Sequence, residues 1–500
     1  MYENPLSCLA KPDFEQGLDC VVNAINAPMW DILVWVLIGV GLFFTVASGF
    51  VQLRLFGHSI KTMLNSRKSG DDTNISGFQA FVTGLASRVG VGNVAGVAIA
   101  IGVGGAGAVF WMWLIALIGM SSALVESTLA QLFKVKDPSG QFRGGPAYYI
   151  KQGLGQNWLG VLFAISLIVC FGFVYQSIQS NTITQAVQSA MGCTAEGDAC
   201  HDNWLMYKHV VGAGLVVLTA PIIFGGIRRV AKIAEIVVPF MALIYLAVAL
   251  FIIVMNIGQV PAVIALIFQK AFTFEAAGGG LFGSMVSIAM MQGIKRGLYS
   301  NEAGQGSAPN AAAAANVKHP VEQGMIQMLG VFVDTLIVCS CTAFVILLAQ
   351  MPENAANLSG IQLTQAALES HVGAWGQYFL AIVLFMFAFS TIIGNYAYAE
   401  SNIQYLKNNE GVLVIFRMLV LAFVYFGAVA KVDVVWNMGD VTMATMAFIN
   451  LFAITLLSGY VFTLIKDYRK QLKLGISQPV FDIKQYPKIA DKVKSNNAWK

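Results

Sequence analysis

The feature that most limits how this 500-residue chain can fold is the recurrence of apolar, uncharged stretches as long as a membrane is thick. A helix needs roughly 20 apolar residues to cross the hydrocarbon core of a bilayer. Such stretches follow one another along nearly the whole chain, and only 11% of its residues are charged, against roughly 25% in an average soluble domain. The sequence therefore predicts an all-α polytopic membrane protein without a soluble domain of useful size.

Apolar runs and the residues that interrupt them predict about eleven transmembrane helices. Their ranges are 30–53, 78–103, 107–133, 158–190, 205–226, 233–256, 279–303, 321–350, 374–404, 412–430 and 436–465. A shorter amphipathic piece at 258–272 is too interrupted to span, and we expect it to lie at the membrane interface. Residues 1–29 are then an extracytoplasmic segment, 30–465 the transmembrane domain and 466–500 a basic cytoplasmic tail.

The distribution of basic residues predicts the orientation. Lys and Arg gather in 54–77, 134–157, 227–232, 304–320, 405–411 and 466–500, whereas the opposite loops contain only Lys11, Lys270 and Lys431. Because cytoplasmic loops carry the excess of Lys and Arg, we expect the N-terminus outside and the C-terminus inside a bacterial inner (plasma) membrane. The same dispersed charges argue against nucleic acid as a partner, and membrane lipid is the expected surrounding. No obligate protein partner is evident.

The cysteines fall into two groups. Cys170, Cys339 and Cys341 lie inside apolar helices and are expected to be small core residues. Cys8, Cys20, Cys193 and Cys200 lie in segments expected outside, where disulfides can form. The pair Cys193 and Cys200 is the better candidate, and two unpaired thiols are an equal alternative.

The spans divide into two halves when the helix 30–53 is set aside as an extra N-terminal helix. Residues 78–256 and 279–465 then contain five helices each, and an odd number per half makes the second half enter the membrane in the opposite sense. The first helix of each half is interrupted, at 87–93 and at 292–297. The pattern predicts a 5+5 inverted repeat whose broken first and sixth core helices meet near the midplane.

Helix breaks leave backbone groups unpaired, and in lipid these groups must find partners. A carboxylate at the half-helix N-termini and a cation at the freed carbonyls would satisfy them. The first break is expected to lie around Gly90–Asn93, and Gln292 and Gly293 of the second break are expected to complete the substrate site. The alternative is that the glycines only allow close helix packing. We favour packing for Gly102–Gly107 and binding for Gly90–Asn93, where a polar Asn and Arg88 accompany the glycines.

Ionisable residues inside apolar spans mark either a functional path or a buried pair. Four of them are Arg88, Glu126, Asp334 and Glu400. For this group we favour a structural ion pair or gate over substrate contact, with Arg88 and Asp334 paired to each other or elsewhere. Lys295 and Arg296 are assigned to the second break, with a gating or structural role. The pair Asn301–Glu302 is expected to shape the helix rather than touch substrate.

The absence of several motifs excludes other classes of membrane protein. The histidines lie in loops or near helix ends, which argues against a haem protein. The sequence contains no H-E-x-x-H, G-x-x-x-x-G-K-[ST] or C-x-x-C pattern, so an intramembrane zinc protease, an ATP-driven pump and a redox protein are disfavoured. The chain is therefore not expected to be an enzyme or to need a cofactor other than a coupling ion.

Five motifs resemble those of the alanine/glycine:cation symporter family. They are Gly90–Ala98 (GVGNVAGVA), Phe110–Trp113 (FWMW), Gly144–Pro146 (GGP), Val237–Met241 (VVPFM) and Ser300–Pro309 (SNEAGQGSAP). The likeness runs from the first span to about residue 465. It implies a fold similar to the leucine-transporter fold with an extra N-terminal helix. It also implies sodium-driven import of small neutral amino acids, such as alanine or glycine, by alternating access.

The resemblance also implies roles for individual residues. The backbone around Val91, Gly92 and Asn93 would hold the substrate carboxylate, and Gln179 would face the substrate. Sodium would be bound by the hydroxyls of Ser390 and Thr391 together with backbone carbonyls near Ala86 and Val89. Oxygen ligands of this kind suit a hard cation.

Two positions depart from the family pattern. Val91 stands where members often have Thr, so only backbone contacts remain there. Asn395 stands where a family pattern has a pocket-capping Trp, which suggests a larger polar substrate such as glutamine or asparagine. The equal alternative is that a neighbouring side chain fills the gap and specificity stays with alanine or glycine. Proton coupling and, less favoured, an ion or solute channel are the alternatives for the function.

Overall fold

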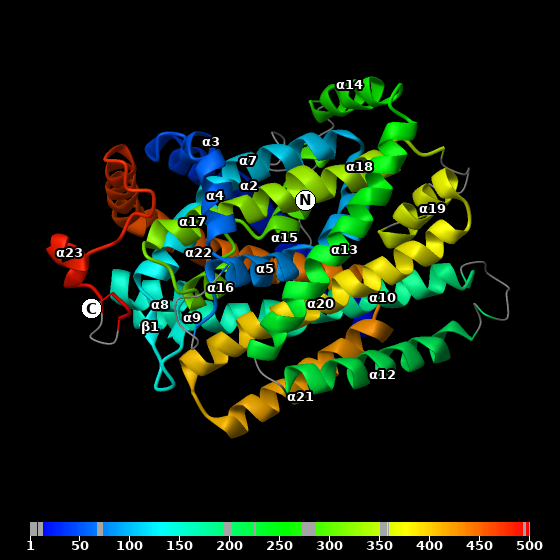
Figure 1. Ribbon diagram of the computed structural model, residues 1–500. Coiled ribbons are helices and arrows are strands. Elements are labelled where there is room, and N and C mark those ends of the chain that lie inside the picture. Colours follow the sequence, from blue (N-terminus) through cyan, green and yellow to red (C-terminus); the bar gives the residue numbers. More distant parts are fainter. Residues whose placement is uncertain are drawn as a thin grey trace.

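The computed structural model describes residues 8, 14–67, 74–193, 200, 203–224, 227–272, 287–350, 358, 360–493 and 497–499, which form a bundle of long helices (Figure 1). The helices of the first half and of the region before it are α2 (Phe14–Ala47), α3 (Val51–Arg54), α4 (Phe56–Asn65), α5 (Gly77–Arg88), η1 (Gly92–Gly96), α6 (Val97–Gly104), α7 (Gly107–Leu132), α8 (Pro146–Tyr149), η2 (Ile150–Leu154), α9 (Asn157–Leu167), η3 (Ile168–Val174), α10 (Tyr175–Ala190), α12 (Trp204–Ile223), α13 (Ile227–Met255) and α14 (Val260–Ala271).

The second half also consists of long helices with short interruptions. Its helices are α15 (Ile288–Asn301), α16 (Pro309–Ala314), α17 (Pro320–Val331), η5 (Phe332–Cys339), α18 (Ser340–Leu347), α19 (Ile361–Val372), α20 (Trp375–Leu406), α21 (Glu410–Val429), α22 (Val432–Lys473), η7 (Ile483–Gln485) and α23 (Pro487–Ala490). A two-stranded hairpin after α7 pairs β1 (Val135–Lys136) with β2 (Phe142–Arg143) antiparallel.

The described helices are long and apolar enough to confirm a polytopic membrane protein. Eight of them could each cross a bilayer, or up to ten if each sharply bent pair is one span. The expected span 279–303 is described only from its later part, as α15, because residues 273–286 lie outside the described ones. The expected interfacial piece is α14, which turns by 101° from the preceding part of α13 and therefore does not prolong that helix.

Helices of the first half pack against the equivalent helices of the second half. The broken first helix contacts α15 and α16, α7 packs on α17, α10 on α20, and α12 on α21. The pair α12 and α21 lies side by side at one edge of the bundle, whereas α5 and α15 lie near its middle (Figure 1). Pairing of equivalent helices agrees with the predicted inverted repeat, and it places the two interrupted helices together.

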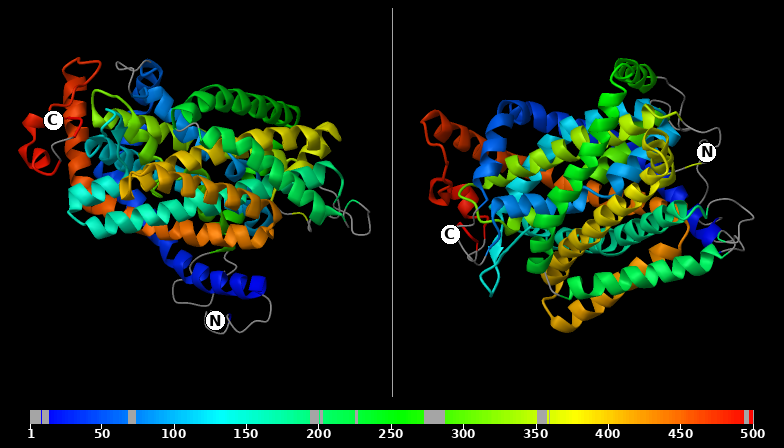
Figure 2. Two further views of the ribbon diagram at one scale, coloured as in Figure 1. Left: turned by 90° about the horizontal axis from the view of Figure 1, so that it is seen from below. Right: turned by 45° about the vertical axis from the view of Figure 1, so that its right-hand side comes forward.

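The extra N-terminal helix is longer than predicted. It begins at Phe14 rather than near residue 30, and it packs against α22 and α7 along one side of the bundle (Figure 2, left). It ends at Ala47, where the left-handed residues Gly49 (φ 71°) and Phe50 (φ 57°) turn the chain into α3. At the other end of the chain, α22 continues to Lys473, beyond the predicted end at 465.

The first helix break lies where the sequence predicts it. Helix α5 ends at Arg88, Val89 is extended (ψ 98°), and the helix resumes with η1 at Gly92. The two pieces meet at an angle of 50°.

The second break exists, but its predicted position is wrong. Residues 292–297 lie inside the uninterrupted helix α15, which ends only at Asn301. The chain then turns through three residues with positive φ, Glu302 (59°), Gly304 (90°) and Gly306 (84°), before α16 begins at Pro309. Lys295 and Arg296 therefore belong to a regular helix and not to a break.

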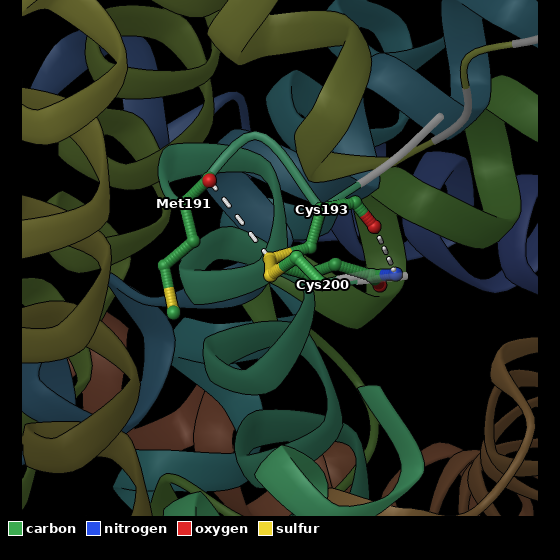
Figure 3. Close-up of a disulfide and its surroundings, with 4 residues drawn as sticks. Met191, Cys193 and Cys200 are labelled. Atoms are coloured by element: carbon green, nitrogen blue, oxygen red, sulfur yellow. Dashed lines mark hydrogen bonds between the residues drawn. A yellow bond between two sulfur atoms is a disulfide. The ribbon is translucent and has the colours of Figure 1, made fainter. Parts of the chain in front are cut away.

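Both candidate cysteine pairs are bonded. The structure contains the disulfides Cys8–Cys20 and Cys193–Cys200, and the second closes the turn after α10 (Figure 3). Cys170, Cys339 and Cys341 are free and buried, as expected of core residues.

Candidate substrate and cation site

The side chain of Asn93 shapes the first helix break. Its Oδ1 accepts a hydrogen bond from the Gly90 N–H at 2.8 Å. In an unbroken helix that N–H would bond to the carbonyl of Ala86, four residues earlier. Since Asn93 has taken the donor, the Ala86 carbonyl at the end of α5 is left for another partner.

That partner is Thr391 on α20. Its hydroxyl oxygen lies 3.1 Å from the Ala86 carbonyl, 3.5 Å from that of Val89 and 3.0 Å from that of Phe387. One hydroxyl hydrogen can serve only one of these three oxygens at a time. The three carbonyl oxygens and Thr391 Oγ1 therefore form a cluster with more hydrogen-bond acceptors than donors. Such a cluster is a suitable environment for a hard cation.

Glycine is required at position 90 by this approach of α20. A Cβ on Gly90 would lie 2.3 Å from Thr391 Oγ1 and 3.2 Å from Thr391 Cβ, so a side chain there would displace the Thr391 hydroxyl from the break. Ser390, the other predicted sodium ligand, is placed differently. Its hydroxyl donates to the Phe387 carbonyl at 2.8 Å and lies 3.9 Å from the sulfur of Met241, and it forms no hydrogen bond with Ala86 or Val89, both of which the structure describes.

A small cavity adjoins the oxygen cluster. It has a volume of about 10 Å³, room for about one water molecule, and is lined by Ser87, Arg88, Val91, Gly92, Tyr175, Gln179, Tyr299, Glu302 and Thr391. All of these residues are buried. The cavity thus lies between the two breaks, with walls from α5, η1, α10, α15 and α20.

One wall of the cavity is aromatic. The rings of Tyr175 and Tyr299 are 4.8 Å apart, and Trp436 of α22 packs 5.0 Å behind Tyr299. Gln179 Nε2 donates to the Tyr299 hydroxyl at 3.1 Å. Its Oε1 is buried and has no hydrogen-bond partner within the described residues, so the amide can still accept a hydrogen bond from a ligand.

The cavity has one basic and one acidic lining residue. Arg88 donates from Nη1 to the Gln327 carbonyl at 3.3 Å, while its Nε and Nη2 are buried and have no hydrogen-bond partner in the described part of the chain. Glu302 accepts hydrogen bonds from the hydroxyls of Ser87 (2.6 Å) and Ser307 (2.5 Å). Glu302 does shape the helix end, as predicted, and the left-handed turn at this residue also places its carboxylate at the cavity.

Asn395 lies just outside the cavity. It is fully buried, and its Oδ1 lies 2.9 Å from the hydroxyl of Ser87, which does line the cavity. Asn395, at the position where the family pattern has a Trp, is thus separated from the cavity by Ser87.

Of the predicted substrate residues, the structure brings Val91, Gly92 and Gln179 to the cavity. The Asn93 side chain points to other partners, with Nδ2 donating to Asp334 Oδ1 at 2.6 Å. Gln292 and Gly293 are not among the lining residues. They lie in the unbroken part of α15, where a Cβ on Gly293 would lie 2.3 Å from the Ala108 carbonyl, so this glycine allows α15 to pack on α7. Their assignment to the second break is wrong.

The other ionisable residues have partners of their own. Asp334 accepts from Asn93, Ser300 and Thr335 and forms no ion pair with Arg88. Glu126 accepts from the Gly304 N–H (3.3 Å) and from Asn450 (2.8 Å), which ties α7 to the second break. Glu400 pairs with Arg417 at 3.3 Å.

Lys295 and Arg296 share one carboxylate, that of Asp440 on α22. Arg296 binds both carboxylate oxygens at 3.0 Å, and Lys295 Nζ lies 3.4 Å from Oδ2. All three side chains are at most 10% exposed.

The comparison with known proteins decides the family. The model of the sodium:alanine symporter family matches residues 15–483. The chain belongs to this family. It is 46% identical to a "probable sodium/glutamine symporter" of Bacillus subtilis, over 93% of this chain and 94% of that protein. It is 35% identical to a "sodium/alanine symporter" of Methanococcus maripaludis, over 90% of this chain and 97% of that protein.

Family membership makes the chain a multi-pass membrane transporter for amino acids and a cation, and not an enzyme. The resemblance drawn from the sequence motifs is thereby confirmed. Among solved structures, MhsT in complex with L-phenylalanine aligns with 78% of this chain and 99% of that chain, at a TM-score of 0.49 and 14% identity. A similarity of that size supports no conclusion about this chain's ligand.

Besides Thr391, which was predicted for sodium, five cavity residues were not predicted from the sequence as substrate contacts: Ser87, Arg88, Tyr175, Tyr299 and Glu302. Tyr175 had a usable signal, because it lies four residues before Gln179 and thus on the same face of α10. Ser87 precedes Arg88 within the predicted break. Glu302 and Tyr299 could not be found while the second break was placed at 292–297.

Proposed function

We propose that this chain is a sodium-coupled symporter that imports neutral amino acids across a bacterial inner membrane. The observation that carries the proposal is the oxygen cluster of Ala86, Val89 and Thr391, which adjoins a small polar cavity at the break of the first core helix. The names of the relatives, a sodium/glutamine and a sodium/alanine symporter, support the same function.

The cation would occupy the space between the freed carbonyls and Thr391. When the Thr391 hydroxyl donates to Phe387 within its own helix, its lone pairs face the carbonyls of Ala86 and Val89. Oxygens that face each other without a shared hydrogen repel, and a sodium ion among them would remove this repulsion. Because Ala86 and Val89 belong to α5 and Thr391 to α20, such an ion would join the broken helix to its neighbour.

The amino acid would bind at this cavity, which has to widen from its present volume of about 10 Å³, with its carboxylate toward the helix break. Val91 and Gly92 open the second half of the broken helix, where backbone N–H groups attract an anion. The unsatisfied Nε and Nη2 of Arg88 add donors on the same wall, and Gln179 Oε1 and Glu302 add acceptors suited to the ammonium group. A zwitterion therefore finds both kinds of partner, whereas a purely apolar solute would leave them unpaired.

Which amino-acid side chain the site accepts depends on Asn395 and its surroundings. Because Asn395 contacts the cavity residue Ser87 rather than the cavity itself, an effect on substrate size would be transmitted through Ser87. Glutamine, asparagine, alanine and glycine are the candidates. The distribution of basic residues supports an external N-terminus and a cytoplasmic C-terminus.

The test is uptake of radiolabelled alanine, glycine and glutamine into proteoliposomes with an imposed Na⁺ or H⁺ gradient. We expect saturable uptake of at least one of the three that collapses without the Na⁺ gradient. Uptake driven equally by H⁺ alone would favour the proton-coupled alternative, and conductance without a gradient requirement would indicate a channel.

A further inference from the structure

The hydrogen bonds around Ser87 contain one hydrogen too few. Its hydroxyl oxygen lies 2.6 Å from Glu302 Oε1 and 2.9 Å from Asn395 Oδ1, and both of these neighbours are acceptors if Glu302 is ionised. A serine hydroxyl can donate to only one of them. At both distances a hydrogen is needed between the oxygens.

Two arrangements supply the missing hydrogen. Both keep the heavy atoms in place, apart from a rotation of the Asn395 amide in the second. In the first, a protonated Glu302 donates to Ser87, and Ser87 donates to Asn395 Oδ1. In the second, Glu302 is ionised and accepts from Ser87, and the Asn395 amide turns by 180° so that its Nδ2 donates to Ser87. In the present orientation Nδ2 is buried and without a hydrogen-bond partner in the described part of the chain. The first arrangement leaves this donor unpaired and the second pairs it with Ser87, so the two arrangements differ by one proton on Glu302 and by the orientation of the Asn395 amide.

The charge around the cavity also favours an added cation or proton. Three fully buried carboxyls, Glu126, Asp334 and Glu302, interact electrostatically with the single guanidinium of Arg88. Among the cavity's lining residues, Arg88 is the one cationic side chain and Glu302 the one carboxyl. The weak acids that face Glu302 from the other elements are Cys170, Tyr175, Tyr299 and Tyr398. None of these can neutralise a carboxylate.

Glu302 differs from the other two carboxyls in what surrounds it. Asp334 receives three side-chain hydrogen bonds, and Glu126 receives the Gly304 N–H and the Asn450 amide. Both are satisfied as anions and neither lines the cavity. Glu302 lines the cavity and is held by two hydroxyls, which can either donate or accept.

We propose that Glu302 is a proton-binding site whose occupancy is linked to that of the cation site at Ala86, Val89 and Thr391. Ser87, the hydrogen-bond partner of Glu302, directly follows Ala86 in the chain, and Asn395 lies one helical turn after Thr391 on α20. A cation bound at that site lowers the free energy of the ionised carboxylate. Cation binding therefore releases the proton from Glu302 to the aqueous phase, and high pH favours cation binding. The inference rests on the proposed sodium-coupled function.

The test measures protons and sodium directly on the purified, detergent-solubilised protein. In weakly buffered solution with a pH-sensitive dye, addition of NaCl should release protons, whereas choline chloride should not. The Na⁺ affinity, measured by ²²Na⁺ scintillation proximity between about pH 5.5 and 8.5, should rise by up to about tenfold per pH unit where Glu302 titrates. Glu302→Gln should abolish both the release and the pH dependence. Glu126→Gln, a matched change of a buried carboxyl outside the cavity, should preserve both.

Several outcomes would overturn the proposal. They are the absence of Na⁺-induced proton release from the wild type, an equal release from Glu302→Gln, and a loss of release in Glu126→Gln alone. If Glu302→Gln does not fold, Ser87→Ala decides, because removal of the bridging hydroxyl must shift the pH midpoint of Na⁺ affinity, and an unchanged midpoint contradicts the proposal. Na⁺-driven uptake in proteoliposomes at one fixed pH tests the proposed function separately, so a failure there is distinguishable from a failure of the proton site.

Discussion

Replacement of Asp440 by Asn should destabilise the protein more than any other single isosteric change on α22. Asp440 is the shared counter-ion of two buried cations, with Arg296 at 3.0 Å on both oxygens and Lys295 at 3.4 Å. The Arg296 guanidinium also lies 4.8 Å from the Trp436 ring, and Lys295 Nζ lies 5.2 Å from the Trp30 ring. Asparagine keeps the shape of the side chain and removes its charge.

The expected magnitude follows from the burial of all three groups. Removal of one partner from a buried ion pair costs about 3–5 kcal/mol, because the other charge stays buried and unpaired. Here two cations lose their counter-ion, so the upper part of that range is expected. The free energy of unfolding is measured by chemical denaturation in detergent, followed by tryptophan fluorescence. The control is Asp433→Asn in the exposed first turn of the same helix, which should cost less than about 1 kcal/mol.

A second variant checks the charge argument. The cluster contains two cations and one carboxylate, so Lys295→Met should cost less than about 1 kcal/mol, since it removes the surplus charge and keeps most of the apolar stem. If Asp440→Asn is no less stable than Asp433→Asn, or if Lys295→Met is as costly as Asp440→Asn, then the buried ion pair does not hold α15 against α22.

Three further predictions concern coupling, specificity and pH. Thr391→Val should raise the half-saturating Na⁺ concentration by about tenfold or more, the loss of roughly 1.4 kcal/mol, whereas Ser390→Ala should change it less than about threefold; equal effects in uptake assays would remove Thr391 from the cation site. Asn395→Trp should shift uptake competition from glutamine toward alanine and glycine, and an unchanged profile would exclude a size-gating role. Burial holds the pKa of His319 below its ordinary value of 6.5, against the opposing hydrogen bond to Asp467. Below about pH 6.5 the unfolded chain therefore binds a proton that the native state does not, and the stability of the fold decreases as the pH drops. In His319→Asn the thermal midpoint should change less between pH 7.5 and 5.5 than it does in the wild type.

The type and approximate positions of the membrane helices could be predicted because the bilayer sets a length scale that the sequence must satisfy. The predicted number, about eleven, exceeds the eight to ten spans found among the described residues. A span such as 158–190 appears as the continuous series α9, η3 and α10 over residues 157–190. The first break could be predicted as well, because Gly90, Gly92 and Asn93 occur together inside an apolar run. What these residues do could not be predicted, since Asn93 acts on the backbone of Gly90 and on Asp334 across a helix interface.

The position of the second break could not be predicted because glycines have two roles that look alike in sequence. Gly293 and Gly297 are packing residues in α15, where added Cβ atoms would lie 2.3 Å from the Ala108 carbonyl and 2.7 Å from the Ile115 side chain. Gly304 and Gly306 instead adopt positive φ and make the break itself. The charges of Lys295 and Arg296 added to the error, because their counter-ion is 144 residues away for Arg296. Burial of a charge could be expected, but its partner came from the packing of the two halves.

The two ends of α15 are held by different interactions, and this bears on how the bundle could move. Arg296 ties one part of the helix to α22, while Glu302, about 9 Å further along the axis, contacts α5 through Ser87. A movement of α15 away from α22 would separate Arg296 from Asp440 at a cost of about 3–5 kcal/mol. That cost corresponds to a factor of roughly 10² to 10³·⁵ in a conformational equilibrium. A ligand shifts such an equilibrium only by its difference in affinity for the two states. The residues lining the cavity include Tyr299 on α15, Ser87 on α5 and Gln179 on α10 and none on α22, so binding there can favour one state only if α5 or α10 stays with α22 when α15 moves.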